Sequence, residues 1–118
     1  MKIQDHARKY LPLTESTYYI LISLIEPLHG YGIMQNVEEI SKGKVKIGPG
    51  TLYGAINKLL KEELIVRAKS KNLEDDRRKT YVLTDIGKEV VIQEYRRLSD
   101  LVECSKEVVN KIGGGEND

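Results

Sequence analysis

The last third of the sequence carries a seven-residue repeat, and this repeat constrains the fold more than any other feature. Its members alternate in spacing between four and three residues and are apolar apart from Ser105: Val91, Tyr95, Leu98, Val102, Ser105, Val109 and Ile112. Such a repeat is typical of a helix that packs along a second helix. A helix over residues 85–112 would be about 42 Å long, which exceeds the width of such a domain. We therefore expect a projecting helix whose apolar repeat residues form a homodimer interface.

The alternative is that this last helix packs only along its own domain. We expect such packing near Ile86 and Val90, but the repeat continues well beyond these residues. Charged residues such as Glu103 and Lys106 occupy the other sides of the helix, as expected for a solvated back.

Three shorter helices are predicted before this one. The first covers about residues 14–28, because a capping threonine precedes it and Gly30 follows it. The second covers about residues 31–41, and the third opens at Gly48-Pro49, where proline suits the first helical turn. The apolar residues at helical spacing, which we expect in the core, are Ile20, Leu21, Leu24, Ile25, Leu28, Ile33, Met34, Val37, Ile40, Leu52, Ile56, Leu59 and Leu60.

A β-hairpin is predicted after the third helix. Residues 64–70 and 79–83 are rich in Val, Ile, Thr and Tyr, which favour strands. The charged segment between them, residues 71–78, has too few apolar residues to be buried and is expected to form the loop. Residues 44–47 alternate between polar and apolar, which predicts a very short extended segment.

These elements predict a mainly α protein with a β-hairpin wing, that is, an α+β winged helix-turn-helix followed by a long C-terminal dimerisation helix. In this architecture the third helix can enter the major groove of DNA, which is about 12 Å wide. We expect a loose N-terminal arm at residues 1–12, a winged helix-turn-helix DNA-binding domain at 13–84, the dimerisation helix at 85–112 and a disordered tail at 113–118.

Charge is unevenly distributed along the 118 residues, although the net charge is only +1. Residues 42–79 contain eleven Lys and Arg against five Asp and Glu, a local charge of +6. The remainder contains eight basic and thirteen acidic residues, a charge of −5. Such asymmetry indicates a polyanion-binding segment on an acidic body. Charge alone does not separate this interpretation from chance clustering on a solvated surface.

The third helix and the hairpin hold the residues expected to contact DNA. Hydroxyl and amide groups suit phosphates and base edges, and asparagine can pair with adenine through two hydrogen bonds. Glycine removes side-chain bulk, so the backbone can approach a neighbouring surface. The candidates are Gly50, Thr51, Tyr53, Asn57, Lys58 and Lys61 in the helix, and Lys71, Arg77, Arg78 and Lys79 around the loop.

Structural alternatives apply to three of these groups. Gly50 and the neighbouring Gly54 could serve tight helix packing, and Tyr53 could sit at the edge of the core. The cations around the loop could be balanced locally by the acidic residues 74–76.

The same segments resemble the PadR family of transcriptional regulators over roughly residues 11–100. The matching runs are Leu13-Thr14-Glu15, Tyr18-Tyr19-Ile20-Leu21, Glu26-Pro27-Leu28-His29-Gly30-Tyr31-Gly32-Ile33, Gly48-Pro49-Gly50-Thr51-Leu52-Tyr53-Gly54, Lys61-Glu62-Glu63-Leu64-Ile65, Arg77-Arg78-Lys79-Thr80-Tyr81 and Leu83-Thr84-Asp85-Ile86-Gly87. The resemblance implies a winged-helix DNA-binding domain, dimerisation through the C-terminal helix, and repression relieved by a small effector. The chain resembles the short subgroup with a single C-terminal helix.

The sequence departs from the family pattern in two respects. Glu63 stands where glycine is common in the family, a small difference. The chain has no tryptophan, so the tryptophan-lined drug pocket of some multidrug-sensing members cannot be carried over. A small aromatic or drug-like effector remains an expectation. Tyrosines such as Tyr18, Tyr19 and Tyr95 could line a dimer pocket, but core packing explains them equally well.

Other functional classes find little support in the sequence. His6 and His29 are the only histidines, and no metal-ligand spacing or phosphate-binding loop is present, so we expect neither an enzyme nor a metal or cofactor site. The single cysteine, Cys104, and the lack of a long apolar stretch lead us to expect a cytoplasmic protein away from the membrane. The alternative function is a winged-helix protein-interaction module that does not bind DNA.

The wing is expected to add sequence-independent attraction for DNA. Replacing Arg77 and Arg78 with alanine should lower the affinity for all DNA sequences. It should also make the salt dependence of binding shallower by about one unit for each phosphate contact that is lost. Mobility-shift titrations at several salt concentrations measure this slope. An unchanged slope would mean that these arginines serve the fold or an ion pair with residues 74–76.

Overall fold

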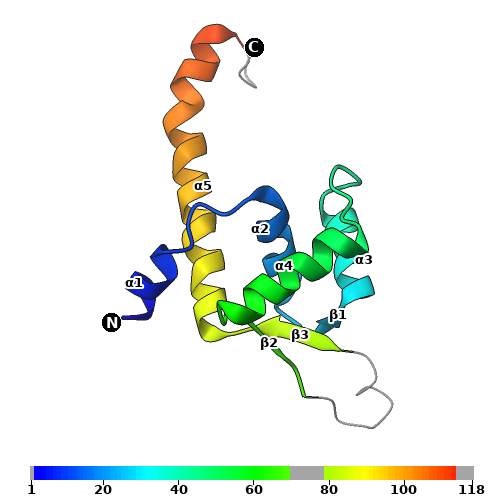
Figure 1. Cartoon of the computed structure of the whole chain (residues 1–118). Coiled ribbons are helices and arrows are strands. Elements are labelled where there is room, and N and C mark those ends of the chain that lie inside the picture. The colour runs from blue at the N-terminus through cyan, green and yellow to red at the C-terminus, as the bar shows by residue number, and fades with distance from the viewer. Residues whose placement is uncertain (1, 70–78, 114–118) are drawn as a thin grey trace.

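Figure 1 shows the computed structural model of the chain, which describes residues 2–69 and 79–113. The helices are α1 (Ile3–Arg8), α2 (Glu15–Ile22), α3 (Gly30–Ile40), α4 (Pro49–Lys61) and α5 (Asp85–Ile112), and the strands are β1 (Leu28–His29), β2 (Ile65–Arg67) and β3 (Thr80–Leu83). The strands form an antiparallel sheet in the order β1-β3-β2. The predicted winged helix-turn-helix with a long last helix is therefore confirmed.

Side chains that precede the helices fix where three of them begin. The Thr14 hydroxyl accepts a hydrogen bond from the backbone of Thr17 at 3.2 Å, and Thr84 caps α5 in the same way at 3.0 Å. The ring of His29 caps α3, because its Nδ1 accepts from the Gly32 backbone at 3.0 Å. Each cap satisfies a backbone N–H group that the first helical turn leaves free. The histidine is thus a helix-terminal residue, as its position before Gly30 indicates.

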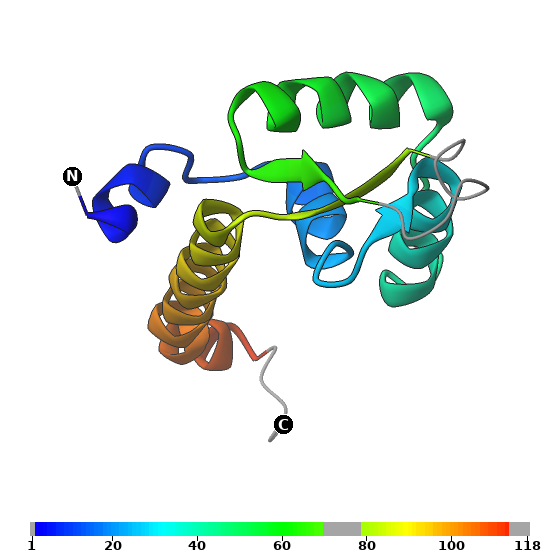
Figure 2. The ribbon, with the colours of Figure 1, turned by 90° about the horizontal axis from the view of Figure 1, so that it is seen from below.

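The core lies where α2, α3 and α4 meet one face of the sheet. Most of the predicted apolar positions are buried, together with residues of the hairpin and one residue of α5: Ile20, Leu21, Leu24, Ile33, Val37, Leu52, Ile56, Leu59, Leu64, Ile65, Tyr81, Leu83 and Val90. Figure 2 shows α4 as the outermost layer, with the sheet between it and the N-terminal part of α5, in yellow. The exposed face of α4 is thereby held away from the rest of the domain.

The predicted first helix is too long, because α2 ends at Ile22. The backbone carbonyl of Leu24 accepts a hydrogen bond from Leu83 at 3.0 Å, and Leu28 and His29 pair with β3 as an edge strand. Pairing with a strand more than fifty residues away has replaced helical hydrogen bonds that the local pattern favours. Ile25, expected in the core, is 61% exposed for this reason, and Ile40 at the end of α3 is also exposed.

The expectation of a loose arm before Pro12 is wrong. Residues 3–8 form α1, which lies against α5, and Ala7 is fully buried there. The Gln93 side chain donates a hydrogen bond to the backbone carbonyl of Gln4 at 2.9 Å. These partners lie more than eighty residues away, so the local sequence carries no sign of them. The predicted extended segment at residues 44–47 keeps its alternating burial, but it joins no strand among the described residues.

A buried carboxylate attaches α5 to the segment that precedes α2. Glu94 is 1% exposed, and its Oε2 accepts from the backbone N–H of Leu13 at 2.8 Å. The guanidinium of Arg97 donates to both carboxylate oxygens, with Nη2 3.1 Å from Oε2. The hydrogen bond from Arg97 lowers the pKa of Glu94 against the opposing effect of burial, and Leu13 lowers it further. Glu94 is therefore a charged link between the two elements.

Beyond this link, α5 leaves the domain. Every residue from 99 to 113 is exposed, and the free half of the helix projects from the molecule in Figure 1. The radius of gyration is 16.8 Å, whereas a compact chain of this length has roughly 13 Å. The prediction of a projecting last helix is confirmed.

The substitution Glu94→Gln tests the charged link. It keeps the shape of the side chain but leaves Arg97 without its charge partner, so the free energy of unfolding at neutral pH should fall by about 1–3 kcal/mol. Because the folded-state pKa of Glu94 is lowered, its contribution is present above the ordinary glutamate pKa and is lost as the pH falls through the folded-state value. The difference between parent and variant should therefore shrink on acidification.

Urea unfolding at a fixed protein concentration, repeated from neutral to acidic pH, measures this difference. Glu107→Gln is the matched control, because Glu107 is an exposed glutamate of the same helix. A loss of stability that does not vary with pH, or an equal loss in the control, would contradict the assigned role of the Glu94 charge.

Candidate nucleic-acid interface

The outer face of α4 is polar and open. All seven of its residues that lie opposite the buried stripe of Leu52, Ile56 and Leu59 are exposed: Gly50, Thr51, Tyr53, Gly54, Asn57, Lys58 and Lys61. The structure therefore brings the six predicted contacts of the third helix onto one accessible surface. Figure 1 shows that α4 lies in front of α2. Their role in DNA contact remains a prediction.

Two glycines leave this surface without side-chain bulk. A Cβ atom built at Gly50 or Gly54 would meet no atom within 4 Å. Packing against the described residues therefore does not require glycine at either position. Glycine inside a helix lowers stability by about 0.5–1 kcal/mol relative to alanine. Gly54 thus carries a stability cost for which no contact within the described chain accounts.

The side chain of Tyr53, on the outer face of α4, packs against the start of α3. Its side chain is 45% exposed, and a Cβ atom built at Gly30 would lie only 2.2 Å from its hydroxyl oxygen. The glycine at the first position of α3 therefore makes room for the tyrosine. Burial raises the pKa of the neighbouring Tyr81, and Tyr53 raises it further. Tyr53 is thus both a packing residue at the core edge and a side chain accessible from outside.

Cations lie along the second half of α4 and the base of the hairpin. Lys58, Lys61 and Lys79 are exposed, and none of them takes part in an ion pair with the described residues. Lys71, Arg77 and Arg78 lie outside the described residues. Exposed ammonium groups suit the phosphates of a nucleic acid.

Two further cations of the hairpin were missed as candidates. Arg67 in β2 pairs across the sheet with Tyr81, and Lys69 follows the strand; both side chains are exposed. They belong to the basic segment of residues 42–79, so its charge count included them. No pattern of spacing distinguished them from the other cations, because their place at the hairpin depends on the register of β2 and β3.

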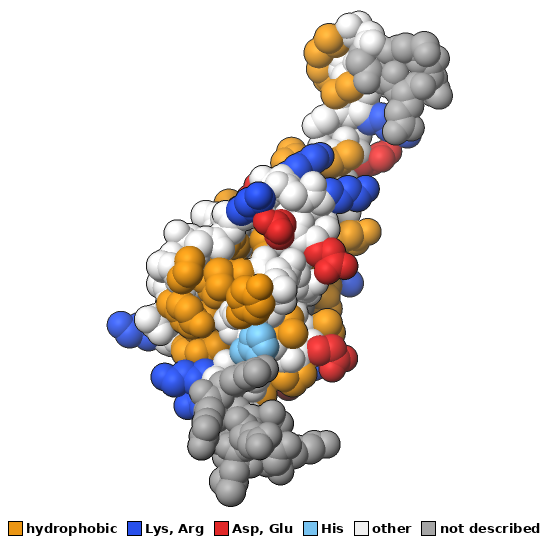
Figure 3. Space-filling view, turned by 90° about the vertical axis from the view of Figure 1, so that its right-hand side faces the viewer, with side chains coloured by type: hydrophobic (Ala, Val, Ile, Leu, Met, Phe, Trp, Pro, Cys, Tyr) orange, Lys and Arg blue, Asp and Glu red, His pale blue; other side chains and the backbone are white. Residues whose placement is uncertain are grey.

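The predicted dimer interface falls into two parts. Val91 and Leu98 are half-buried against their own domain, whereas Tyr95, Val102, Val109 and Ile112 are exposed, Ile112 by 78%. Leu101 and Val108 are also exposed, and each precedes a repeat residue by one position, so they widen the apolar stripe. Figure 3 shows apolar side chains, in orange, reaching the far end of the projecting helix. Dimerisation itself remains a prediction.

The described residues give no other obvious chemical site. They contain no group of three or more histidine, cysteine, aspartate or glutamate side chains placed to hold a metal ion. None of the helices described is both long and apolar enough to cross a membrane.

Comparison with known proteins agrees with this geometry. Residues 19–93 match the sequence model of the transcriptional regulator PadR-like family. An uncharacterised 37.1 kDa protein in transposon TN4556 of Streptomyces fradiae is 33% identical over 75 residues, which are 64% of this chain and 20% of that protein. The chain thus spans about a fifth of the length of this relative.

Solved structures share the fold over most of the chain. RosR of H. salinarum is 26% identical with a TM-score of 0.64, covering 87% of this chain and 92% of that one. A transcriptional regulator from Clostridium thermocellum is 28% identical with a TM-score of 0.56, covering 91% and 96%. Solved structures of regulators share the fold. Because the family model matches more than half of the residues, the chain belongs to the PadR-like family of transcriptional regulators.

Proposed function

We propose that the protein is a sequence-specific repressor that binds an inverted-repeat operator as a homodimer. In this proposal α4 enters the major groove, and the β2–β3 hairpin reaches the flanking backbone. The observation that carries it is the outer face of α4, where polar side chains surround two glycines with open space above them. Repression relieved by a small effector completes the proposal.

The glycines favour DNA over a protein partner as the occupant of this face. A helix reads the major groove best when its backbone can come close to the base edges, and a glycine allows that approach. The exposed cations of α4 and of the hairpin base would lie toward the phosphates on either side. A protein-interaction module without DNA binding is the second candidate, and steep weakening of binding with rising salt distinguishes the two.

The free half of α5 supports the homodimer. An exposed stripe that contains Val102, Val109 and Ile112 is the kind of apolar surface that a second copy of the helix covers. A twofold dimer places two α4 helices about one DNA turn apart, or a multiple of that distance, so the operator would be an inverted repeat.

Gly54→Ala separates stability from DNA binding. The new methyl group meets no atom of the described chain, so the free energy of unfolding should rise by about 0.5–1 kcal/mol. If α4 lies in the groove, the same methyl group meets the DNA, and operator affinity should fall by about tenfold. Calorimetry and fluorescence anisotropy measure the two effects. A variant that is more stable and binds DNA as tightly as the parent protein would contradict the proposed approach of the backbone.

Asn57→Ala tests base recognition on the same face. It should weaken operator binding by about 1–3 kcal/mol with little change in stability, because its side chain is exposed. Tyr53→Ala should weaken binding similarly, but it also removes the contact with Gly30, so Tyr53→Phe is needed to isolate the hydroxyl group. Asn110→Ala, in the free half of α5, is the matched control. Binding by the Asn57 and Tyr53 variants at the parent level would exclude α4 as the reading helix.

Two charges on the stripe of α5 should separate the dimer. Leu98→Asp with Val102→Asp would bury unpaired charge at the interface, but Leu98 also contacts its own domain. Val102→Asp with Val109→Asp avoids this difficulty, because both side chains are exposed within one copy. We expect folded monomers with strongly weakened operator binding, measured by circular dichroism, light scattering and anisotropy. Asn110→Asp, which lies off the stripe, should stay dimeric, and a monomeric parent protein at micromolar concentration would overturn the interface.

A further inference from the structure

The turn between α3 and α4 carries three lysines that do not belong to the outer face of α4. These turn lysines, Lys42, Lys44 and Lys46, are all exposed. Val45 is half-buried against the core and Ile47 is only 8% exposed, so apolar side chains fix the segment to the domain. Where side chains alternate in this way, outward neighbours are about 6–7 Å apart. This distance is close to the separation of neighbouring phosphates along one DNA strand.

A buried serine holds the turn in shape. Ser41 is 3% exposed, and its hydroxyl oxygen accepts a hydrogen bond from the Val45 backbone at 3.0 Å. The same oxygen lies 3.2 Å from the Glu38 carbonyl and 3.3 Å from the Val45 carbonyl, which are acceptors for its proton. Lys42 and Gly43 adopt left-handed conformations, with φ of 55° and 79°, and reverse the chain after α3. The backbone that carries the turn lysines is therefore ordered before they bind a partner, which lowers the entropic cost of binding.

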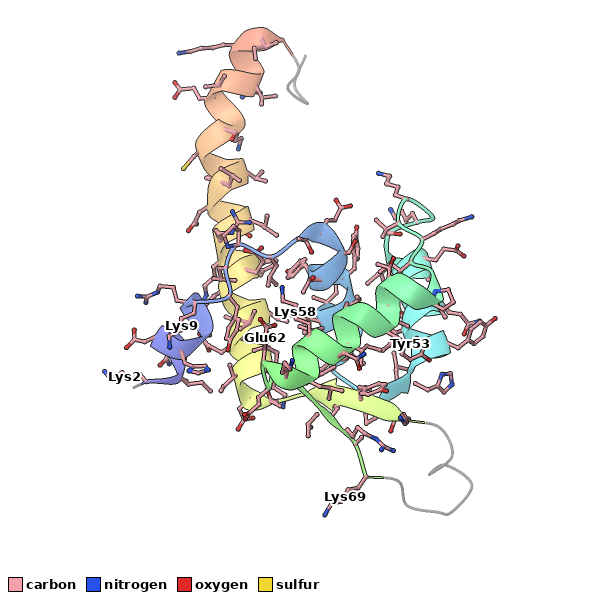
Figure 4. All side chains as sticks on the ribbon, viewed as in Figure 1. Lys2, Lys9, Tyr53, Lys58, Glu62 and Lys69 are labelled. Carbon is pink, nitrogen blue, oxygen red and sulfur yellow. The ribbon has the colours of Figure 1, made fainter. Side chains whose placement is uncertain are left out.

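The turn and the hairpin lie on opposite sides of α4. In Figure 1 the turn lies above the N-terminal end of the helix, and β2 and β3 lie below the helix. Figure 4 shows Lys69, which follows β2, on this lower side. A helix in the major groove has one sugar–phosphate strand on each side. When the hairpin lies toward one of these strands, the turn lies toward the other.

We propose that the turn lysines bind phosphates of this second strand, so that α4 is held in the groove between two backbone contacts. This step rests on the proposed function, because it takes α4 as the helix that enters the groove. Contacts with phosphates fix how a protein sits on the duplex, but they do not read its sequence. The turn lysines therefore position α4, while the outer face that includes Asn57 reads the bases.

Two glutamates at the end of α3 oppose this attraction. Glu38 and Glu39 are both exposed, and the ammonium group of Lys46 lies 3.7 Å from the Glu38 carboxylate. An ion pair between such exposed side chains contributes little to stability, so a phosphate can replace Glu38 as the partner of Lys46. Glu38 weakens DNA binding in two ways, because it repels the phosphate and competes for the lysine.

Neutral versions of two turn lysines test the contact. Lys42→Gln with Lys44→Gln should make the salt dependence of DNA binding shallower by about 1.8 units, that is, about 0.9 for each phosphate contact. The affinities for a selected operator and for unrelated DNA should fall by the same factor. Lys88→Gln with Lys111→Gln, two exposed lysines of α5, is the matched control. Equal changes in the variant and the control would mean general electrostatic attraction and would overturn the contact.

Single uncharged phosphates in the operator locate the contact. One phosphate at a time is replaced by a methylphosphonate, and fluorescence anisotropy gives the affinity of the parent protein and of the variant with Lys42→Gln and Lys44→Gln. We expect neighbouring positions on one strand where the replacement weakens the parent protein several-fold but leaves the variant unaffected. Phosphates on the hairpin side should weaken both proteins equally. If the two proteins respond alike at every position, the turn does not touch the backbone.

Glu38→Gln should have the opposite effect. It releases Lys46 and removes a negative charge beside the phosphates, so binding to all DNA should become several-fold tighter. Glu107→Gln, in the free half of α5, is its control. Unchanged or weaker binding by Glu38→Gln would contradict the contact by Lys46. A parent protein that binds no DNA would refute the proposed function together with this contact, whereas a parent protein that binds DNA while its turn variants behave like the controls would refute the contact alone.

Discussion

The placement of the projecting helix depends on one buried carboxylate. Glu94 holds the backbone of Leu13 on one side and the guanidinium of Arg97 on the other. Arg97 lies on α5 as well and would move with Glu94, so swinging α5 away from the linker before α2 would break the hydrogen bond from Leu13. A hydrogen bond to a charged group contributes about 1.5–3 kcal/mol. The carboxylate lies about one helical turn before α5 leaves the domain. It therefore fixes the direction in which the free half of the helix points.

Local sequence determines much of this fold, and the parts it leaves undetermined rest on distant contacts. The caps at Thr14 and Thr84, the end of α5 at Gly113 and the core stripe of α4 follow from residue type and spacing, and all were predictable. The helix α1, the strand β1 and the role of Glu94 were not, because each depends on a partner more than fifty residues away. From the sequence alone, a glutamate between the apolar positions of a heptad repeat is predicted to face solvent. Only the structure shows that the linker before α2 covers it.

The candidate interface was predictable in composition but not in its geometry. The spacing of Leu52, Ile56 and Leu59 fixes which side of α4 is buried, so the polar face opposite follows directly. The open space above Gly54 and the packing of Tyr53 against Gly30 could not be predicted from the sequence. Both depend on how α3 packs beside α4. Gly54 lies in the middle of a helix, and no contact with the described residues requires a glycine there. The stability that it costs is of the kind expected at functional surfaces.

The free half of α5 also lowers stability without stabilising contacts in return. An isolated helix shorter than about 12–15 residues is marginal in water, and residues 99–112 are all exposed. Apolar side chains line one side of this half, and Leu101 and Val108 widen the stripe beyond the heptad positions. Exposure of such a stripe is unfavourable by roughly 25 cal/mol for each Å² left in water. A second copy of the helix would remove that cost and support the helix along its length, which is the physical reason for proposing that two chains act together.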